Sequence, residues 1–338
     1  MATPRDRLGR LAITLPAPFH DARACVELAR RAEEEWGYDA IWLAETNGPD
    51  SFSLAGAIAT VTSRVTIGTG IVPVYNRTPA VLAMSAGTLA QLSGDRFVLG
   101  LGSSSHAIVG DWNGIPFEAP LGHVRECVQL VRQALAGGKT DFEGEHFRSR
   151  GLRLGSPPPK AVPLYVAALR GRMLRLAGEV GEGLVVNFFP VTALPKMLAA
   201  YREGAERAGR EARGDEVVCR FQVAVTDDVP KARELVRMAF GGYLAQPVYN
   251  RFLAWCGFED EARAIAEAFA RRDRAGTAAA IHDDLIDRIT ILGSAESCRE
   301  QVAAFVEAGV TTPVIAPLAT DRDAVQRTFE AFAPAALP

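Results

Sequence analysis

The chain has 338 residues, of which 48% are hydrophobic and 23% charged, and this composition excludes a disordered chain and favours a globular protein with a large core. A formal net charge of −3 provides no basic field, so nucleic-acid binding and association with a membrane surface are both disfavoured. The five cysteines are dispersed and form no C-x-x-C arrangement, so we predict neither a disulfide framework nor a metal site.

The N-terminal segment predicts a protein that is neither secreted nor anchored. Its apolar run, residues 11–15, is too short for the core of a signal peptide or for a membrane span. Together with the unpaired cysteines, this favours a cytoplasmic location.

Short, almost wholly apolar runs alternate with helical patterns along the whole chain. Such runs are typical of strands covered on both faces, as parallel sheets require. Strands are predicted at residues 11–15, 40–44, 65–72, 96–102, 164–168, 183–188, 217–225 and 313–317. Helices are predicted at residues 21–36, 53–62, 79–92, 121–136 and 296–308, and others start near residues 171 and 192.

Eight β/α units in strict alternation predict a closed (β/α)8 TIM barrel, an α/β fold, that forms a single domain over residues 1–338. Residues 228–291 are mostly helical and interrupt the alternation, so we predict a helical insertion before the last strand. Tyr249, Trp255, His282 and Arg288 lie in this insertion and are candidates to cover the barrel mouth.

In such a barrel, chemistry is carried by the loops that follow the carboxyl ends of the strands. The second strand runs through Trp42 into Glu45, Thr46 and Asn47, which offer an acid, a hydroxyl and an amide. The alternative for Glu45 is that it caps the next helix or pairs with an arginine.

Glycines cluster at the ends of the third and fourth predicted strands. Gly68 and Gly70 precede Ile71 and Pro73, where glycine indicates either close approach of the backbone to a ligand or a bent strand end. Residues 100–106 form a glycine–serine turn that either holds a cofactor or simply turns the chain. The acids that follow it lie too close for a dinucleotide-binding fingerprint, so we reject that fold.

The fifth strand gives way to a helix at Gly171, between Arg170 and Arg172. Free N–H groups at a helix N-terminus, with guanidinium charge nearby, predict a phosphate site, and two solvated arginines are the alternative. The sixth strand ends at Asn187 and Phe188, which form either an apolar wall for a flat ring or part of the core.

Taken together, these segments resemble the bacterial luciferase-like flavin-dependent oxidoreductases, in particular the branch that depends on the deazaflavin coenzyme F420. The motifs are A-x-x-A-E-x-x-x-G-Y-D-x-x-W-L-A-E at 29–45, T-S-R-V-x-I-G-T-G at 62–70, N-R-x-P-A-x-x-A at 76–83, L-S-G-D-R-F-V-L-G-L-G at 92–102, F-x-G-x-x-F at 142–147 and L-A-G-E-x-G-E-G at 176–183. They cover residues 10–210 well, and the closing unit up to residue 317 moderately.

The resemblance implies a cofactor ring over the third strand, with a non-prolyl cis peptide at Gly70-Ile71. It implies cofactor contacts from Glu45, Gly70, Ile71, Pro73, Ser103, Ser104, Ala168, Leu169, Arg170, Gly171, Arg172 and Met173. Substrate contacts are expected from Trp42, Asn47, Asn187, Phe188 and His282. The chain departs from its relatives where Thr46 replaces a histidine and Ser105 replaces a glutamate, so Glu45, Thr46 and His106 are the catalytic candidates.

The leading hypothesis is therefore an F420-dependent oxidoreductase that transfers a hydride between C5 of the deazaflavin and a small organic substrate. One alternative is an FMN-dependent monooxygenase that uses reduced flavin and oxygen and is supplied by a reductase. Another is a barrel that binds such a ligand without turnover. The resemblance also implies a homodimer.

Overall fold

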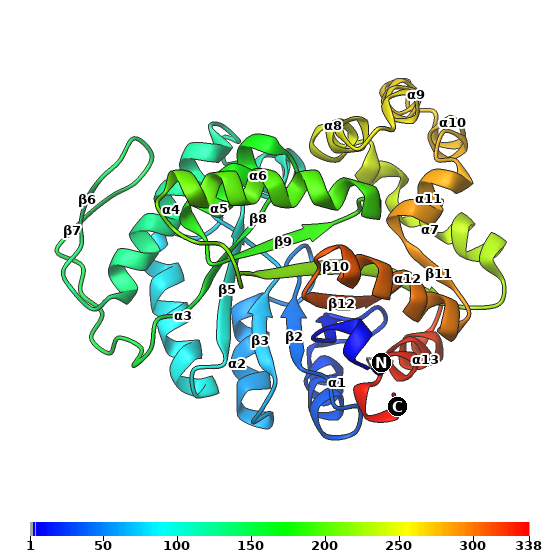
Figure 1. Cartoon of the computed structure of the whole chain (residues 1–338). Helices are drawn as coiled ribbons and strands as arrows, with labels where there is room; N and C mark the ends of the chain where they lie inside the picture. The colour runs from blue at the N-terminus through cyan, green and yellow to red at the C-terminus, as the bar shows by residue number, and fades with distance from the viewer. Residues whose placement is uncertain (1–2, 4, 338) are drawn as a thin grey trace.

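The computed structural model describes residue 3 and residues 5–337, and eight parallel strands form a ring at its centre (Figure 1). These strands are β1 (Ala12–Leu15), β2 (Ala40–Leu43), β3 (Thr66–Thr69), β5 (Phe97–Gly102), β8 (Leu164–Ala167), β9 (Gly183–Asn187), β10 (Glu216–Val225) and β12 (Thr312–Pro317). β1 pairs with both β2 and β12, and β10 pairs with both β9 and β12, so the ring closes. The predicted (β/α)8 barrel is confirmed.

Helices follow the strands and pack around the ring. They are α1 (Ala22–Glu34), α2 (Ser51–Val61), α3 (Pro79–Ser93), α4 (Pro120–Leu135), α5 (Gly171–Val180), α6 (Leu194–Arg207), α12 (Ala295–Ala308) and α13 (Arg322–Ala331). The first three begin where the sequence offers a cap: the side chains of Asp21, Asp50 and Thr78 each accept a backbone N–H of the first turn. Within residue 3 and residues 5–337, no helix is both long enough and apolar enough to cross a membrane.

The predicted helical insertion is also confirmed. It contains α7 (Val229–Leu244), α8 (Pro247–Trp255), α9 (Glu259–Ala270), α10 (Arg274–Ala279) and α11 (Asp283–Ile289), followed by the short strand β11 (Ile291–Gly293), which pairs with β10. These helices have their own buried apolar cluster, which includes Val236, Leu244, Ile265 and Leu285. In Figure 1 they stand beside the barrel, in yellow to orange.

The structure differs from the sequence expectations in several elements. The strand expected at residues 65–72 is divided into β3 and β4 (Val72–Pro73). A two-stranded hairpin, β6 (Asp141–Glu143) and β7 (Arg148–Arg150), lies outside the barrel sheet. Helix α13 follows the last strand and was not predicted. Short helical turns complete the description at Asp6–Leu8, Ala107–Asp111, Val191–Ala193 and Pro334–Ala336.

A layer of buried side chains fills the inside of the barrel. Its largest members are Trp42 and Tyr165, whose rings stack with centroids 5.8 Å apart. Gly68 faces this layer, and a Cβ atom at that position would lie 2.6 Å from the Trp42 ring. The glycine at position 68 therefore makes room for the indole, and the Trp42–Tyr165 layer forms a floor inside the barrel.

Candidate active site

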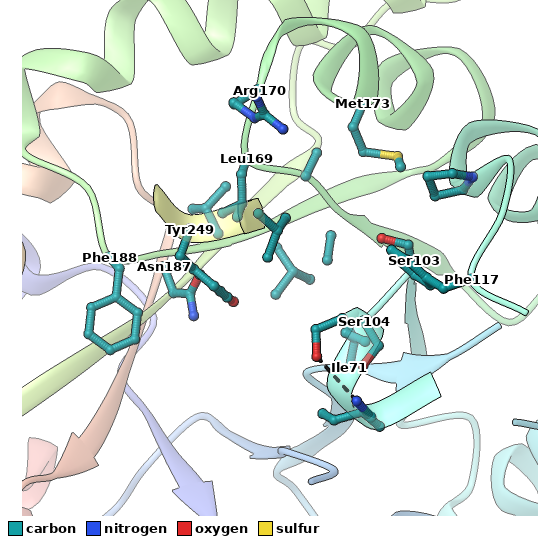
Figure 2. Close-up of a pocket in the computed structure, with 18 of the residues that line it drawn as sticks. Ile71, Ser103, Ser104, Phe117, Leu169, Arg170, Met173, Asn187, Phe188 and Tyr249 are labelled. Atoms are coloured by element: carbon teal, nitrogen blue, oxygen red, sulfur yellow. Dashed lines mark hydrogen bonds between the residues drawn. The ribbon is translucent and has the colours of Figure 1, made fainter. Parts of the chain in front are cut away.

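A cavity of about 1070 Å³ lies over the carboxyl ends of the strands, where the fold family places ligands (Figure 2). This is the upper end of the usual range for small-molecule sites, roughly 300–1,000 Å³. The predicted site residues that line it are Glu45, Thr46, Gly70, Ile71, Ser103, Ser104, Ala168, Leu169, Arg170, Arg172, Met173, Asn187 and Phe188.

One side of the cavity is built by the backbone of β3, β4 and β5. The peptide bond Gly70-Ile71 is cis, as the family resemblance implies. A Cβ atom on Gly100 would lie 1.9 Å from the carbonyl oxygen of Thr69, so only glycine lets these two strands approach so closely. The Thr69 hydroxyl bridges the gap with 2.8 Å hydrogen bonds to the N–H and the carbonyl of Gly100. Hence Gly100 serves contact between strands, and Ile71 and the serines beyond it line the cavity.

Glu45 lies at the edge of the cavity with its carboxylate already bound by protein. Arg77 donates to its two oxygens at 2.6 and 2.9 Å, and the N–H of Ser51, at the start of α2, donates at 3.2 Å. Arg77 also pairs with Asp50. Both structural alternatives, helix capping and pairing with an arginine, therefore occur, and Glu45 fixes the loop after β2.

Three arginines converge on the cavity at the start of α5. Arg170 ends the loop after β8, Arg172 lies in the first turn of α5, and Arg251 comes from α8 of the insertion. Burial, followed by the charges of Arg251 and Arg172, lowers the pKa of Arg170. Within residue 3 and residues 5–337 none of the three forms an ion pair with a carboxylate, so the cluster carries uncompensated positive charge that suits a phosphate.

The opposite side of the cavity is built from side chains of β9, β10 and the insertion. Tyr243 donates a hydrogen bond to the hydroxyl of Tyr249, and Asn187 lies beside both hydroxyls. Burial raises the pKa of both tyrosines, so both stay protonated at neutral pH. Phe188 packs against Phe240, with ring centroids 5.0 Å apart. Figure 2 shows Asn187 and Tyr249 across the cavity from Ile71 and Ser104.

Several predicted substrate contacts lie away from the cavity. Trp42 is 2% exposed and belongs to the floor of the barrel, because its indole fills the space that Gly68 leaves. His282 is exposed at the N-terminus of α11. Asn47 is exposed beyond Thr46, whose hydroxyl donates to it at 3.4 Å. Their positions do not support substrate contact.

Three further predicted site residues also lie outside the described lining. Pro73 is buried in β4, where it is paired with Gly102. Gly171 is the first residue of α5 and contributes backbone between the two arginines. The His106 side chain is 68% exposed, and its Nδ1 lies 3.5 Å from Oδ1 of Asp111. A proton relay through His106 therefore finds no support in this arrangement.

The sequence analysis missed Arg77, Arg220, Tyr243 and Arg251. Arg220 had a detectable signal: it follows the inward-facing Val218 by two positions on one strand, and strand residues two apart share a face. Tyr243 and Arg251 lie in the insertion, where helical periodicity does not specify which face meets the barrel.

The fold and cavity together define a (β/α)8 barrel with a ligand site at its carboxyl-terminal mouth. Residues 7–312 match the model of the luciferase-like monooxygenase family, and the chain belongs to that family, as its motifs predict.

Two curated relatives and one solved structure illustrate the likeness. The 5,10-methylenetetrahydromethanopterin reductase of Archaeoglobus fulgidus is 29% identical over 314 residues, which cover 90% of this chain and 92% of the relative. The F420-dependent glucose-6-phosphate dehydrogenase of Rhodococcus erythropolis is 29% identical, covering 85% of this chain and 86% of the relative. The coenzyme F420-dependent tetrahydromethanopterin reductase structure from Methanopyrus kandleri superposes with a TM-score of 0.82 at 24% identity, covering 96% of this chain and 97% of that one.

Proposed function

We propose that the chain is an oxidoreductase that depends on coenzyme F420 and acts on a small organic substrate. The bound deazaflavin supplies hydride transfer at C5, and it lacks the N5 atom through which flavins react readily with oxygen. The observation that carries the proposal is the cluster of Arg170, Arg172 and Arg251, whose uncompensated charge faces a cavity large enough for a tricyclic cofactor and a substrate. The relatives from Archaeoglobus fulgidus and Rhodococcus erythropolis support the same chemistry.

The residues divide into two groups of proposed roles. The arginine cluster, the N-terminus of α5, Ser103 and Ser104 hold the phosphate-bearing tail, while the Gly70-Ile71 segment supports the ring. Glu45, held by Arg77, positions the loop after β2, and Thr46 is the remaining predicted catalytic side chain on the lining. Asn187 and Phe188 form the substrate side.

The experiment is a competition between cofactors. The purified chain is equilibrated with oxidised F420 and FMN together and bound cofactor is quantified by fluorescence; anaerobic oxidation of reduced F420 is then tested with enones, imines, aldehydes and nitroaromatics as hydride acceptors. We expect saturable F420 binding and hydride transfer without oxygen. Tight FMN binding with oxygen consumption and no F420 binding would establish the alternative, a flavin monooxygenase, which the family description favours. Binding without any turnover would indicate a ligand-binding barrel.

A homodimer is part of the proposal, and its support is an apolar face on α3. Val81, Met84 and Leu92 are 41%, 49% and 51% exposed, and their spacing places them on one side of the helix. Solution mass measurements should give twice the mass of the chain.

We also propose a cytoplasmic location, which suits five free cysteines, and a partner reductase that regenerates the reduced cofactor.

A further inference from the structure

Arg220 places a positive charge inside the barrel mouth, far around the ring from the strand that supports the proposed cofactor ring. It lies on β10, in register with Asn187 of β9 and Val314 of β12. In the closed ring, β10 stands opposite β3, which carries Gly70 at its end. The charge of Arg220 therefore belongs to the β9–β10 side of the cavity, whereas the phosphate cluster belongs to the β8 loop and α8.

The contacts of Arg220 leave its charge uncompensated. Its Nε donates to the hydroxyl of Thr14 at 3.4 Å, a weak contact with a neutral group. The groups that face it from the insertion are the hydroxyls of Tyr243 and Tyr249. Within residue 3 and residues 5–337 it forms no ion pair, although the other arginines around the barrel commonly pair with carboxylates. Arginine does not lose its proton in proteins, so this site keeps a half-buried cation.

Keeping such a cation costs stability unless something compensates it. If Arg220 had a purely structural role, a carboxylate partner would compensate its charge, as Asp215 does for Arg210 at 2.7 Å. Arg220 instead lines the open cavity, which makes its N–H groups available to a ligand. Beside it, the protonated tyrosine pair adds hydroxyl donors, because Tyr243 donates to Tyr249 and leaves the Tyr249 proton free to be donated onward.

We infer that the β9–β10 side of the cavity is a subsite for a carboxylate of the substrate, bound by the Arg220 guanidinium and the Tyr249 hydroxyl. The substrates of this chain are then small organic acids. A planar guanidinium with a neighbouring hydroxyl matches the two oxygens of a carboxylate. This inference rests on the proposed function, because it assigns the phosphate cluster to the cofactor and only the second cationic site to the substrate.

The test uses the holoenzyme saturated with F420, so that the phosphate cluster is occupied. Benzoate is titrated as the probe and benzamide as its neutral counterpart, with binding followed by calorimetry. We expect saturable benzoate binding that weakens at least tenfold in Arg220→Met, while benzamide binding and F420 affinity stay within twofold of the wild type. Arg220→Lys keeps the positive charge but loses the planar guanidinium that can donate two parallel hydrogen bonds, so it should recover part of the benzoate affinity. This variant also serves as the test if Arg220→Met folds poorly.

Two results would overturn the subsite. Benzoate affinity unchanged in Arg220→Met would show that the guanidinium does not bind the probe. A loss of F420 affinity in place of benzoate affinity would assign Arg220 to the cofactor. If F420 does not bind the wild type, that result refutes the proposed function without testing the carboxylate subsite. The same benzoate titration on the cofactor-free chain, comparing Arg220→Met with Arg172→Met, then still decides which arginine binds the carboxylate.

Discussion

The two sides of the cavity are built by different means. On the β3–β5 side, backbone geometry shapes the wall: Gly70-Ile71 is cis, and Gly100 touches the Thr69 carbonyl. On the β9–β10 side, long side chains from a barrel strand and from two inserted helices shape it, notably Arg220, Tyr243 and Tyr249. A backbone wall tolerates few substitutions, whereas a side-chain wall can be changed one residue at a time. The first side suits a constant cofactor and the second a substrate that varies between relatives.

The sharpest test of this comparison adds one methyl group to the backbone wall and, as a control, one to an exposed helix position outside the cavity. Gly100→Ala places a Cβ atom against the Thr69 carbonyl and should lower the free energy of unfolding by about 3 kcal/mol, as overpacking of backbone does. Gly242→Ala, on exposed helix α7 with no atom within 4 Å of the new Cβ, should be neutral or stabilise by roughly 0.5–1 kcal/mol. Urea unfolding measures both free energies, and equal effects would show that the close approach of Gly100 to Thr69 does not restrict the backbone wall.

The second prediction concerns the charges at the phosphate end. The double substitution Arg170→Ala and Arg172→Ala should weaken F420 binding by roughly 1–3 kcal/mol in total, because two charge-assisted contacts are lost. Arg251→Ala should weaken it further. Arg263→Ala is the matched control, since that arginine pairs with Asp260 on the surface of α9. Fluorescence titration gives the affinities, and an unchanged dissociation constant in the double variant would remove both arginines from the site.

The smallest predicted effect tests the support beneath the backbone wall. Glu33 of α1 is 5% exposed and accepts the N–H groups of Ser63, Arg64 and Val65, which lead into β3. Burial raises its pKa, but these hydrogen bonds outweigh burial and hold the pKa below the ordinary value. Glu33→Gln should lower the free energy of unfolding by about 1–2 kcal/mol at neutral pH.

The pH dependence of that cost has a defined sign. A lowered pKa in the folded state stabilises the fold above the ordinary glutamate pKa of about 4.3, and the contribution disappears as pH falls through the folded value. The stability gap between wild type and Glu33→Gln should therefore narrow in acid. A gap that is constant from pH 7 to pH 3 would contradict the assignment.

The same contrast explains what could be predicted from the sequence. The barrel strands were visible because strands buried on both faces are continuous apolar runs, and the β8 loop arginines were visible because strand, loop and helix follow one another locally. Tyr243 and Arg251 were not, since only tertiary packing brings α7 and α8 over the mouth. Strands β6 and β7 have three residues each and polar composition, which leaves no periodicity to detect. For α13 the sequence does offer a cap, because the Asp321 side chain accepts the backbone N–H of Ala324.

The Trp42–Tyr165 floor has a consequence for traffic through the molecule. Because stacked rings block the barrel axis beneath the cavity, reactants cannot arrive from one end and leave by the other. Incoming substrate and departing product must therefore both pass through the carboxyl-terminal mouth of the barrel.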